Sequence, residues 1–210
     1  MSKRSFYRPR VLIFAKEPLP GRVRTRLGRL SGGGIGMVEA AGWYRRQSHG
    51  LARRLARDPR WESWIAVSPD AAGLSSRFWP RGLKRWAQRG GDLGARMRRA
   101  FREFPPGPLV IVGADIPGVA PRHIASAFRA LGAAEAVFGP ADDGGYWLVG
   151  LRRARRAAPP GLFDGVRWSS ESTLVDSVES LRGERHALID RLRDVDGAAD
   201  LPGSERARYL

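Results

Sequence analysis

The first stretch of the sequence with residues suited to chemistry is a basic loop, FAKEPLPGRVRTRL at residues 14–27. Arginine and lysine side chains bind phosphate oxygens, and arginine can donate two parallel hydrogen bonds to them. A glycine in the loop lets a ligand approach the backbone closely. A solvated basic loop is the alternative, because the P-loop patterns GxxxxGKS and GxxxxGKT are absent. The candidate phosphate-binding residues are Lys16, Gly21, Arg22, Arg24 and Arg26.

An aspartate follows a continuous apolar segment, in VIVGADIPG at residues 110–118. An ionised carboxylate next to a hydrophobic core needs a partner, because its desolvation is costly. Mg²⁺ or Mn²⁺ suits Asp115, since hard cations bind carboxylate and phosphate oxygens together; a turn or helix cap is the alternative. Asp194 and Asp196, in RDVDGAADL at 193–201, form a second acidic turn. That turn contributes to a metal site only if the fold brings it near Asp115.

Two adjacent aspartates precede another apolar segment, in GPADDGGYWLVGL at residues 139–151. Asp-Gly is a strong signal for a β-hairpin, so a hairpin connection is the simpler interpretation. Two carboxylates and two glycines exceed what a turn requires, which favours a loop that closely approaches a substrate. Asp142 or Asp143 would then bind an acceptor hydroxyl or act as a general base. The rest of this substrate loop is Gly144, Gly145 and Tyr146.

Two further stretches are candidates for helix N-termini. The segment RWSSEST at 167–173 is typical of a helix start with a serine cap. In GGDLG at 90–94, Asp92 is either a cap or part of a helix start that faces a phosphate. No spacing of serine, histidine and aspartate favours a hydrolase.

Apolar segments of strand length alternate with segments of helical spacing along the chain. The predicted strands are 10–15, 64–68, 108–115, 136–140 and 146–151, and the predicted helices are 37–57, 92–104, 121–132 and about 170–182. This alternation predicts an α/β sandwich around a mostly parallel sheet. Ligands of such sheets bind beyond the carboxyl ends of the strands, where the basic loop and Asp115 would lie.

The composition limits the classes of protein that the chain can represent. Its 210 residues suit a single domain, 1–210, with a core at about 10–201. Cysteine is absent, which excludes disulfides, thiolate metal sites and cysteine nucleophiles. No apolar run approaches the roughly 18 residues of a membrane helix, and the first residues lack the apolar segment of a signal peptide. We therefore expect a cytoplasmic protein without a membrane span.

The net charge of +16 has two interpretations. It fits an anionic ligand or nucleic acid. All but three of the 37 basic residues are arginines, however, and this imbalance is typical of a GC-rich genome. The arginines are dispersed and no nucleic-acid motif occurs, which argues against nucleic acid as a partner. The basic loop is the exception to this dispersed pattern, because its arginines lie close together in the sequence.

Taken together, six ordered motifs resemble one protein family: FAKEPLPGRVRTRL, GDLGARM, VIVGADIPG, GPADDGGYWLVGL, LFDGVRWSSEST and DVDGAADL. They are similar to the bacterial DUF2064 proteins, glycosyltransferase-like proteins associated with radical-SAM partners. That family is related to the GT-A nucleotide-diphospho-sugar transferase fold and, more distantly, to MobA-like and CofC-like nucleotidyltransferases. The resemblance covers about 10–201. It implies a GT-A-like, Rossmann-like three-layer α/β/α sandwich.

The resemblance also implies roles for individual residues. The basic loop would contact the phosphates of a nucleotide, and Asp115 would be a metal ligand. A late DIDTPEDL-like segment would supply a second ligand, Asp196. The sequence departs from that pattern, because DVDGAADL lacks its threonine and glutamate, and this weakens the metal pair. Arg24 stands where lysine is common in the family.

The expected function is an Mg²⁺- or Mn²⁺-dependent GT-A-type transferase that uses a nucleotide-sugar donor and an acceptor that the sequence leaves open. Nucleotidyl transfer from a nucleoside triphosphate is the alternative, because both reactions need the same metal and phosphate contacts. A non-catalytic protein that binds a nucleotide or a nucleic acid is the alternative from another class. Neither the sequence nor the family decides among them, because a fold does not fix a function.

Overall fold

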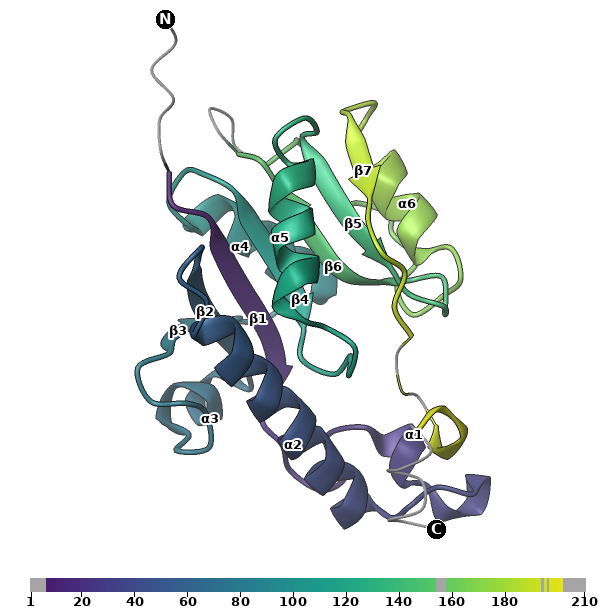
Figure 1. Cartoon of the computed structure of the whole chain (residues 1–210). Coiled ribbons are helices and arrows are strands. Elements are labelled where there is room, and N and C mark those ends of the chain that lie inside the picture. Colours follow the sequence, from purple (N-terminus) through teal and green to yellow (C-terminus); the bar gives the residue numbers. More distant parts are fainter. Residues whose placement is uncertain (1–6, 154–157, 194, 196, 202–210) are drawn as a thin grey trace, which may run out of the picture.

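A seven-stranded sheet forms the centre of the computed structural model, which describes residues 7–153, 158–193, 195 and 197–201 (Figure 1). The strand order is β3-β2-β1-β4-β6-β5-β7. Strand β6 is antiparallel to both of its neighbours, and the other neighbouring pairs are parallel. The strands are β1 Arg10–Lys16, β2 Glu62–Ser68, β3 Lys84–Ala87, β4 Leu109–Gly113, β5 Ala136–Pro140, β6 Tyr146–Leu151 and β7 His186–Leu188.

Helices cover both faces of this sheet. In Figure 1, α2 and α5 lie in front of the sheet and α4 lies behind it. The α-helices are α1 Thr25–Gly28, α2 Met37–Ala56, α3 Asp70–Ser75, α4 Leu93–Glu103, α5 Pro121–Ala130 and α6 Thr173–Glu179; the 3₁₀ helices are η1 Leu30–Gly32 and η2 Ala198–Asp200. No helix in the described part of the chain is long and apolar enough to span a bilayer.

Strand β1 shows how the sequence builds the two cores. Side chains alternate between the faces of a strand, so successive apolar residues supply both sides. Val11 and Ile13 belong to the core that includes Trp43 of α2, whereas Leu12 belongs to the core that includes Phe101 of α4. Strands of this kind are buried on both faces, as in parallel sheets covered by helices. The predicted three-layer α/β/α sandwich with a mostly parallel sheet is confirmed.

The structure corrects two predicted boundaries. Strand β4 ends at Gly113, so Asp115 lies in the turn two residues beyond the strand rather than at its end. The last helix begins at Thr173 instead of about 170, because the preceding serines are used in a turn in which the Ser170 hydroxyl donates to the carbonyl of Arg167 at 2.7 Å. Strands β3 and β7 and helix α3 were not predicted, since they are short and partly exposed.

The two-sided core yields a stability prediction. Leu12 is 0% exposed and Leu30 is 74% exposed. Leu12→Ala should lower the free energy of unfolding by about 2–5 kcal/mol, because it removes buried methyl groups and leaves a cavity. Leu30→Ala is the matched control and should change it by less than about 0.5 kcal/mol. Urea unfolding measures both, and equal losses would contradict the assignment of Leu12 to the core.

Candidate functional site

A cavity of about 440 Å³ opens at the edge of the sheet where β1, β2 and β4 end. The end of a strand is where a buried apolar segment first exposes polar groups, and neighbouring parallel strands end side by side. Seven parts of the chain line the cavity: the basic loop with the end of β1, α2, the end of β2, the segment after β3, the start of α4, the end of β4 with the turn that follows it, and the start of β6. Its polar and charged lining residues include Lys16, Arg24, Arg26, Tyr44, Gln88, Arg96, Asp115 and Tyr146.

The basic loop is held in place by two buried side chains. Val23 is 3% exposed and Leu27 is 0% exposed, so both anchor the loop to the core. Of the five residues predicted to bind phosphate, Lys16, Arg24 and Arg26 line the cavity, whereas Gly21 and Arg22 are exposed outside its lining. Gly21 has a φ of +72°. The amide of the next residue, Arg22, donates to the carbonyl of Leu19 at 3.0 Å and closes a turn.

Arg24 contacts the predicted metal ligand. Its Nη2 lies 2.6 Å from Oδ2 of Asp115, and the two side chains are 11% and 40% exposed. The same guanidinium donates to the carbonyl oxygens of Asp115 at 3.2 Å and of Val195 at 2.9 Å. Arg24 thus connects the basic loop, the turn after β4 and the segment that precedes η2. The structure brings together two residues for which the sequence predicted separate roles.

Tyr44 of α2 contributes a buried hydroxyl to the same cavity. The backbone amide of Lys16 donates to this hydroxyl at 2.9 Å. Burial, followed by the negative charge of Asp115, raises the pKa of Tyr44 above its ordinary value. The phenol therefore stays protonated at neutral pH and offers a hydrogen-bond donor near Asp115.

Gln88 and Arg96 line the cavity but were not predicted as site residues. The side-chain amide of Gln88 is 4% exposed and donates to the carbonyl oxygens of Ala15 at 3.1 Å and Ala66 at 2.6 Å. Its oxygen accepts from Nη1 of Arg96 at 3.5 Å. The signal for this wall was the stretch QRGGDLGAR, in which a short segment joins β3 to α4 and Arg96 lies in the first turns of the helix.

Asp92 caps the start of α4. Its carboxylate accepts from the amide of Ala95 at 2.7 Å, which satisfies one of the free amides of the first turn. The capping interpretation of GGDLG is therefore confirmed. Leu93 and Arg96 of the same helix line the cavity, so the helix start also contributes to the site.

The two adjacent aspartates lie in the turn of the β5–β6 hairpin, as the simpler interpretation predicts. Asp143 accepts from the amide of Gly145 at 2.9 Å, and Asp142 lies 3.9 Å from Nη1 of Arg191. Neither aspartate is among the residues that line the cavity, whereas Tyr146 is. The catalytic role of Asp142 and Asp143 stays a prediction.

Tyr146 and Gly144 tie this hairpin to α6. Burial raises the pKa of Tyr146 above its ordinary value, and its hydroxyl accepts from Ser177 at 3.3 Å. The carbonyl of Gly144 accepts from the amide of Leu174 at 3.0 Å. Gly144 has a φ of +81°, and a Cβ atom there would collide with the backbone of Glu171. The hairpin is thus fixed against the first turn of α6.

The second predicted metal ligand, Asp196, lies outside the described residues, as does Asp194. Its neighbour Val195 is described and contacts Arg24. Within the described part of the chain, no group of three or more histidine, aspartate or glutamate side chains is arranged to hold a metal ion. Asp115 is the predicted metal ligand that the structure describes.

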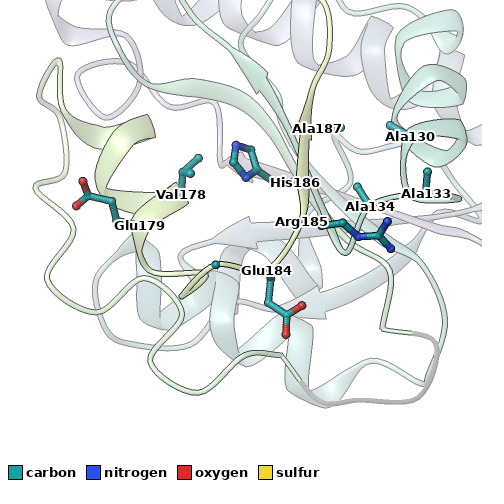
Figure 2. A pocket seen from close by; sticks show the side chains of 10 residues that line it. Ala130, Ala133, Ala134, Val178, Glu179, Glu184, Arg185, His186 and Ala187 are labelled. Carbon is teal, nitrogen blue, oxygen red and sulfur yellow. The ribbon is translucent and has the colours of Figure 1, made fainter.

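A larger hollow, of about 750 Å³, lies at the opposite edge of the sheet, where β7 begins (Figure 2). Its lining includes three alanines of the α5–β5 connection and the side chains of Glu179, Glu184, Arg185 and His186. In Figure 2 the charged side chains point in different directions instead of toward one another. Ligand sites usually have polar groups that converge on the ligand. The cavity at the carboxyl edge is therefore the better candidate, although it is smaller than this hollow.

The sheet order, the two helical layers and the cavity at the carboxyl edge define a GT-A-like fold, the class found among nucleotide-diphospho-sugar transferases and nucleotidyltransferases. A family model, DUF2064, described as an uncharacterized protein conserved in bacteria, matches residues 51–170. The chain belongs to this family. The resemblance drawn from the six motifs is confirmed.

Solved structures share this fold over nearly the whole chain. A candidate nucleotide-diphospho-sugar transferase of Desulfovibrio desulfuricans G20 is 30% identical, with a TM-score of 0.77, over 91% of this chain and 84% of that one. A CMP:2-keto-3-deoxy-manno-octonic acid synthetase complexed with CTP is 13% identical, with a TM-score of 0.56, over 95% and 98%. A Mycobacterium tuberculosis H37Rv protein complexed with manganese is 14% identical, with a TM-score of 0.51, over 97% and 98%. No curated protein matches the chain.

Two glycines, one in the basic loop and one in the β5–β6 hairpin, yield a prediction that separates the cost of a strained backbone from the cost of a steric collision. Gly21 and Gly144 both have positive φ, but a Cβ atom at Gly21 meets nothing within 4 Å. Gly21→Ala should lower the free energy of unfolding by about 1 kcal/mol, because alanine disfavours the left-handed backbone conformation and no atom lies in the way of its Cβ. Gly144→Ala should cost about 1–3 kcal/mol more, because the hairpin must move away from α6. Urea unfolding compares the two, and equal losses would show that the contact with Glu171 does not constrain the loop.

Proposed function

We propose that the protein is an enzyme, a GT-A-type transferase that takes a nucleotide sugar as donor. The observation that carries this proposal is the 440 Å³ cavity at the carboxyl edge, which is lined by four basic side chains and one carboxylate. Ligands of open α/β sheets bind at this edge. The 30% identity to a candidate nucleotide-diphospho-sugar transferase over 91% of the chain supports the same class of substrate.

The basic residues account for recognition of a diphosphate. Lys16 and Arg26 line the cavity from the basic loop, and Arg96 lines it from α4. A nucleotide sugar carries its two phosphates between nucleoside and sugar, so cations on both walls can contact them together. As the sugar–phosphate bond breaks, negative charge grows on the leaving diphosphate. Fixed cations lower the energy of that transition state.

A divalent cation fits the chemistry of this cavity. Asp115 offers an oxygen ligand of the kind that Mg²⁺ and Mn²⁺ prefer, and it already holds a positive group, the Arg24 guanidinium, at 2.6 Å. We propose Asp115 as one ligand and Asp196, outside the described residues, as a second. When bound, the ion would neutralise diphosphate charge. The manganese complex of a protein with the same fold is consistent with this expectation.

The acceptor would approach from the β5–β6 hairpin. Tyr146, the first residue of β6, lines the cavity, and Asp142 and Asp143 lie in the turn that precedes it. In the proposal, one of these carboxylates binds the acceptor hydroxyl or takes its proton. The carboxylate of Asp143 already accepts from Gly145, so Asp142 is the less constrained of the two.

Nucleotidyl transfer is the second candidate function. The fold is shared with a synthetase solved with CTP, and the cavity contacts expected for a triphosphate are the same. The two reactions differ in the bond that breaks: glycosyl transfer releases a nucleoside diphosphate, and nucleotidyl transfer releases pyrophosphate. A nucleotide-binding protein without turnover is the remaining possibility, which the product assay below also tests.

A ligand and product screen distinguishes these candidates. The melting temperature of the full chain with Mg²⁺ is measured with nucleotide sugars, nucleoside diphosphates and nucleoside triphosphates. Separate, unheated reactions that also contain sugar and alcohol acceptors are assayed for released nucleoside diphosphate or pyrophosphate. The proposed function predicts that a nucleotide sugar raises the melting temperature and that a nucleoside diphosphate is released. Stabilisation by triphosphates alone, with pyrophosphate release, would replace it with nucleotidyl transfer. Stabilisation without any product would indicate a binding protein.

The basic loop yields a matched pair of variants. Arg26 lines the cavity, whereas Arg29, three residues later, is exposed outside its lining. Arg26→Gln should weaken the binding of a nucleoside diphosphate by about tenfold, the usual size of a charged hydrogen bond. Arg29→Gln removes the same charge from a position just after this loop and should leave the affinity within about twofold. Isothermal titration calorimetry measures both, and equal losses would indicate a general charge effect instead of a direct contact.

A further inference from the structure

Two charged groups that the sequence assigns to different ligands are already bound to each other in the cavity. Nη2 of Arg24 and Oδ2 of Asp115 lie 2.6 Å apart. A guanidinium at this distance makes a charge-assisted hydrogen bond with a carboxylate. It therefore occupies Oδ2, one of the two carboxylate oxygens that a divalent cation could bind.

The backbone holds Arg24 in this position. Arg24 has a φ of +47°, a left-handed conformation that few residues other than glycine adopt, and it lies at the N-cap of α1. Its guanidinium also donates to the carbonyl oxygens of Asp115 and Val195. With a side chain only 11% exposed, the guanidinium has exchanged water for these partners. This arrangement is a built contact and not a chance surface pair.

We propose that Arg24 is the resident cation of the Asp115 carboxylate, and that a divalent ion binds Asp115 in competition with it. The inference rests on the proposed function only where it takes Asp115 as a metal ligand. Two positive groups on one carboxylate repel each other, so the proposal has the guanidinium move off Oδ2 when the ion binds. The displaced guanidinium is then available to a phosphate oxygen, which is the role that the sequence predicted for it.

The surroundings of Asp115 strengthen this competition. Besides Arg24, the side chains of Lys16, Arg26 and Arg96 line the same cavity, and Asp115 is the carboxylate among its described lining residues. A single carboxylate among these groups cannot neutralise both Arg24 and a divalent ion. The affinity for metal without nucleotide should therefore be low and limited by Arg24, and the anionic nucleotide should raise it.

Mn²⁺ titration followed by electron paramagnetic resonance tests the proposal without any measurement of turnover. The free ion gives a six-line signal that is lost on binding, so the full chain is titrated without nucleotide. Arg24→Gln should bind Mn²⁺ about tenfold more tightly than the wild type, because an adjacent opposite charge changes the cation affinity of a carboxylate by about that factor or more. Arg29→Gln should match the wild type within about twofold. Asp115→Asn should lose the binding in both the wild-type and the Arg24→Gln backgrounds.

Several outcomes would overturn the proposal. If Arg24→Gln binds Mn²⁺ no more tightly than Arg29→Gln, Arg24 is a structural clamp and not a competitor. If Asp115→Asn retains the wild-type affinity, the ion binds elsewhere. A purely structural role of Arg24 predicts a loss of affinity, which is opposite in sign to the competition. Failure of the nucleotide-sugar screen leaves this metal result standing, so the two proposals can fail separately.

A second measurement follows the wild-type protein itself and uses a variant only to assign one signal. In ¹⁵N-labelled wild-type protein, the Nε–H signal of Arg24, assigned with Arg24→Lys, should shift when Mg²⁺ is added. The Nε–H signal of Arg29 is the internal control and should stay in place. A stationary Arg24 signal at Mg²⁺ concentrations that shift the backbone amide of Asp115 would overturn the displacement.

Discussion

Burial on both faces is the constraint on which the rest of this structure depends. The strands in the middle of the sheet pack against helices on either side, so their side chains are apolar in both directions. Charged groups can then appear only where a strand ends, because a carboxylate or guanidinium inside either core would lose its hydration without a partner. The parallel direction of β1, β2 and β4 gathers these ends at one edge. The charged cavity is a direct consequence of that topology.

The same constraint explains what the sequence could predict. Continuous apolar runs identified β1, β4, β5 and β6 with nearly correct boundaries, and amphipathic spacing identified α2, α4 and α5. Two positions at the carboxyl edge followed, since Lys16 is the last residue of β1 and Asp115 lies two residues beyond the end of β4. Strand β3 and strand β7 carry charged or exposed residues at the sheet margins, so no apolar pattern distinguishes them from loops. Their positions depend on pairing with strands far away in the sequence.

The contacts within the site could not be predicted. That Arg24 lies against Asp115 depends on its left-handed backbone conformation and on the segment around Val195, 171 residues away in the sequence. The cap at Asp92 is local and was predicted as one of two alternatives, whereas the Gln88 contacts join the ends of three strands. Asp142 and Asp143 were singled out by their type, and they lie in the hairpin turn, outside the residues that line the cavity. Residue type indicates possible chemistry, and only the tertiary structure selects the residues that meet.

The Gln88 amide shows what such contacts contribute. Both carbonyl oxygens that receive its NH₂ group belong to strands, so the side chain cannot rotate without breaking the ends of β1 and β2. The oxygen of the amide must then face Arg96 and the interior of the cavity. Side-chain entropy has already been lost during folding, and a ligand that meets this wall does not have to order it again. Gln88 thereby makes one wall of the cavity preorganised, with a fixed acceptor that a complementary ligand would meet with a hydrogen-bond donor.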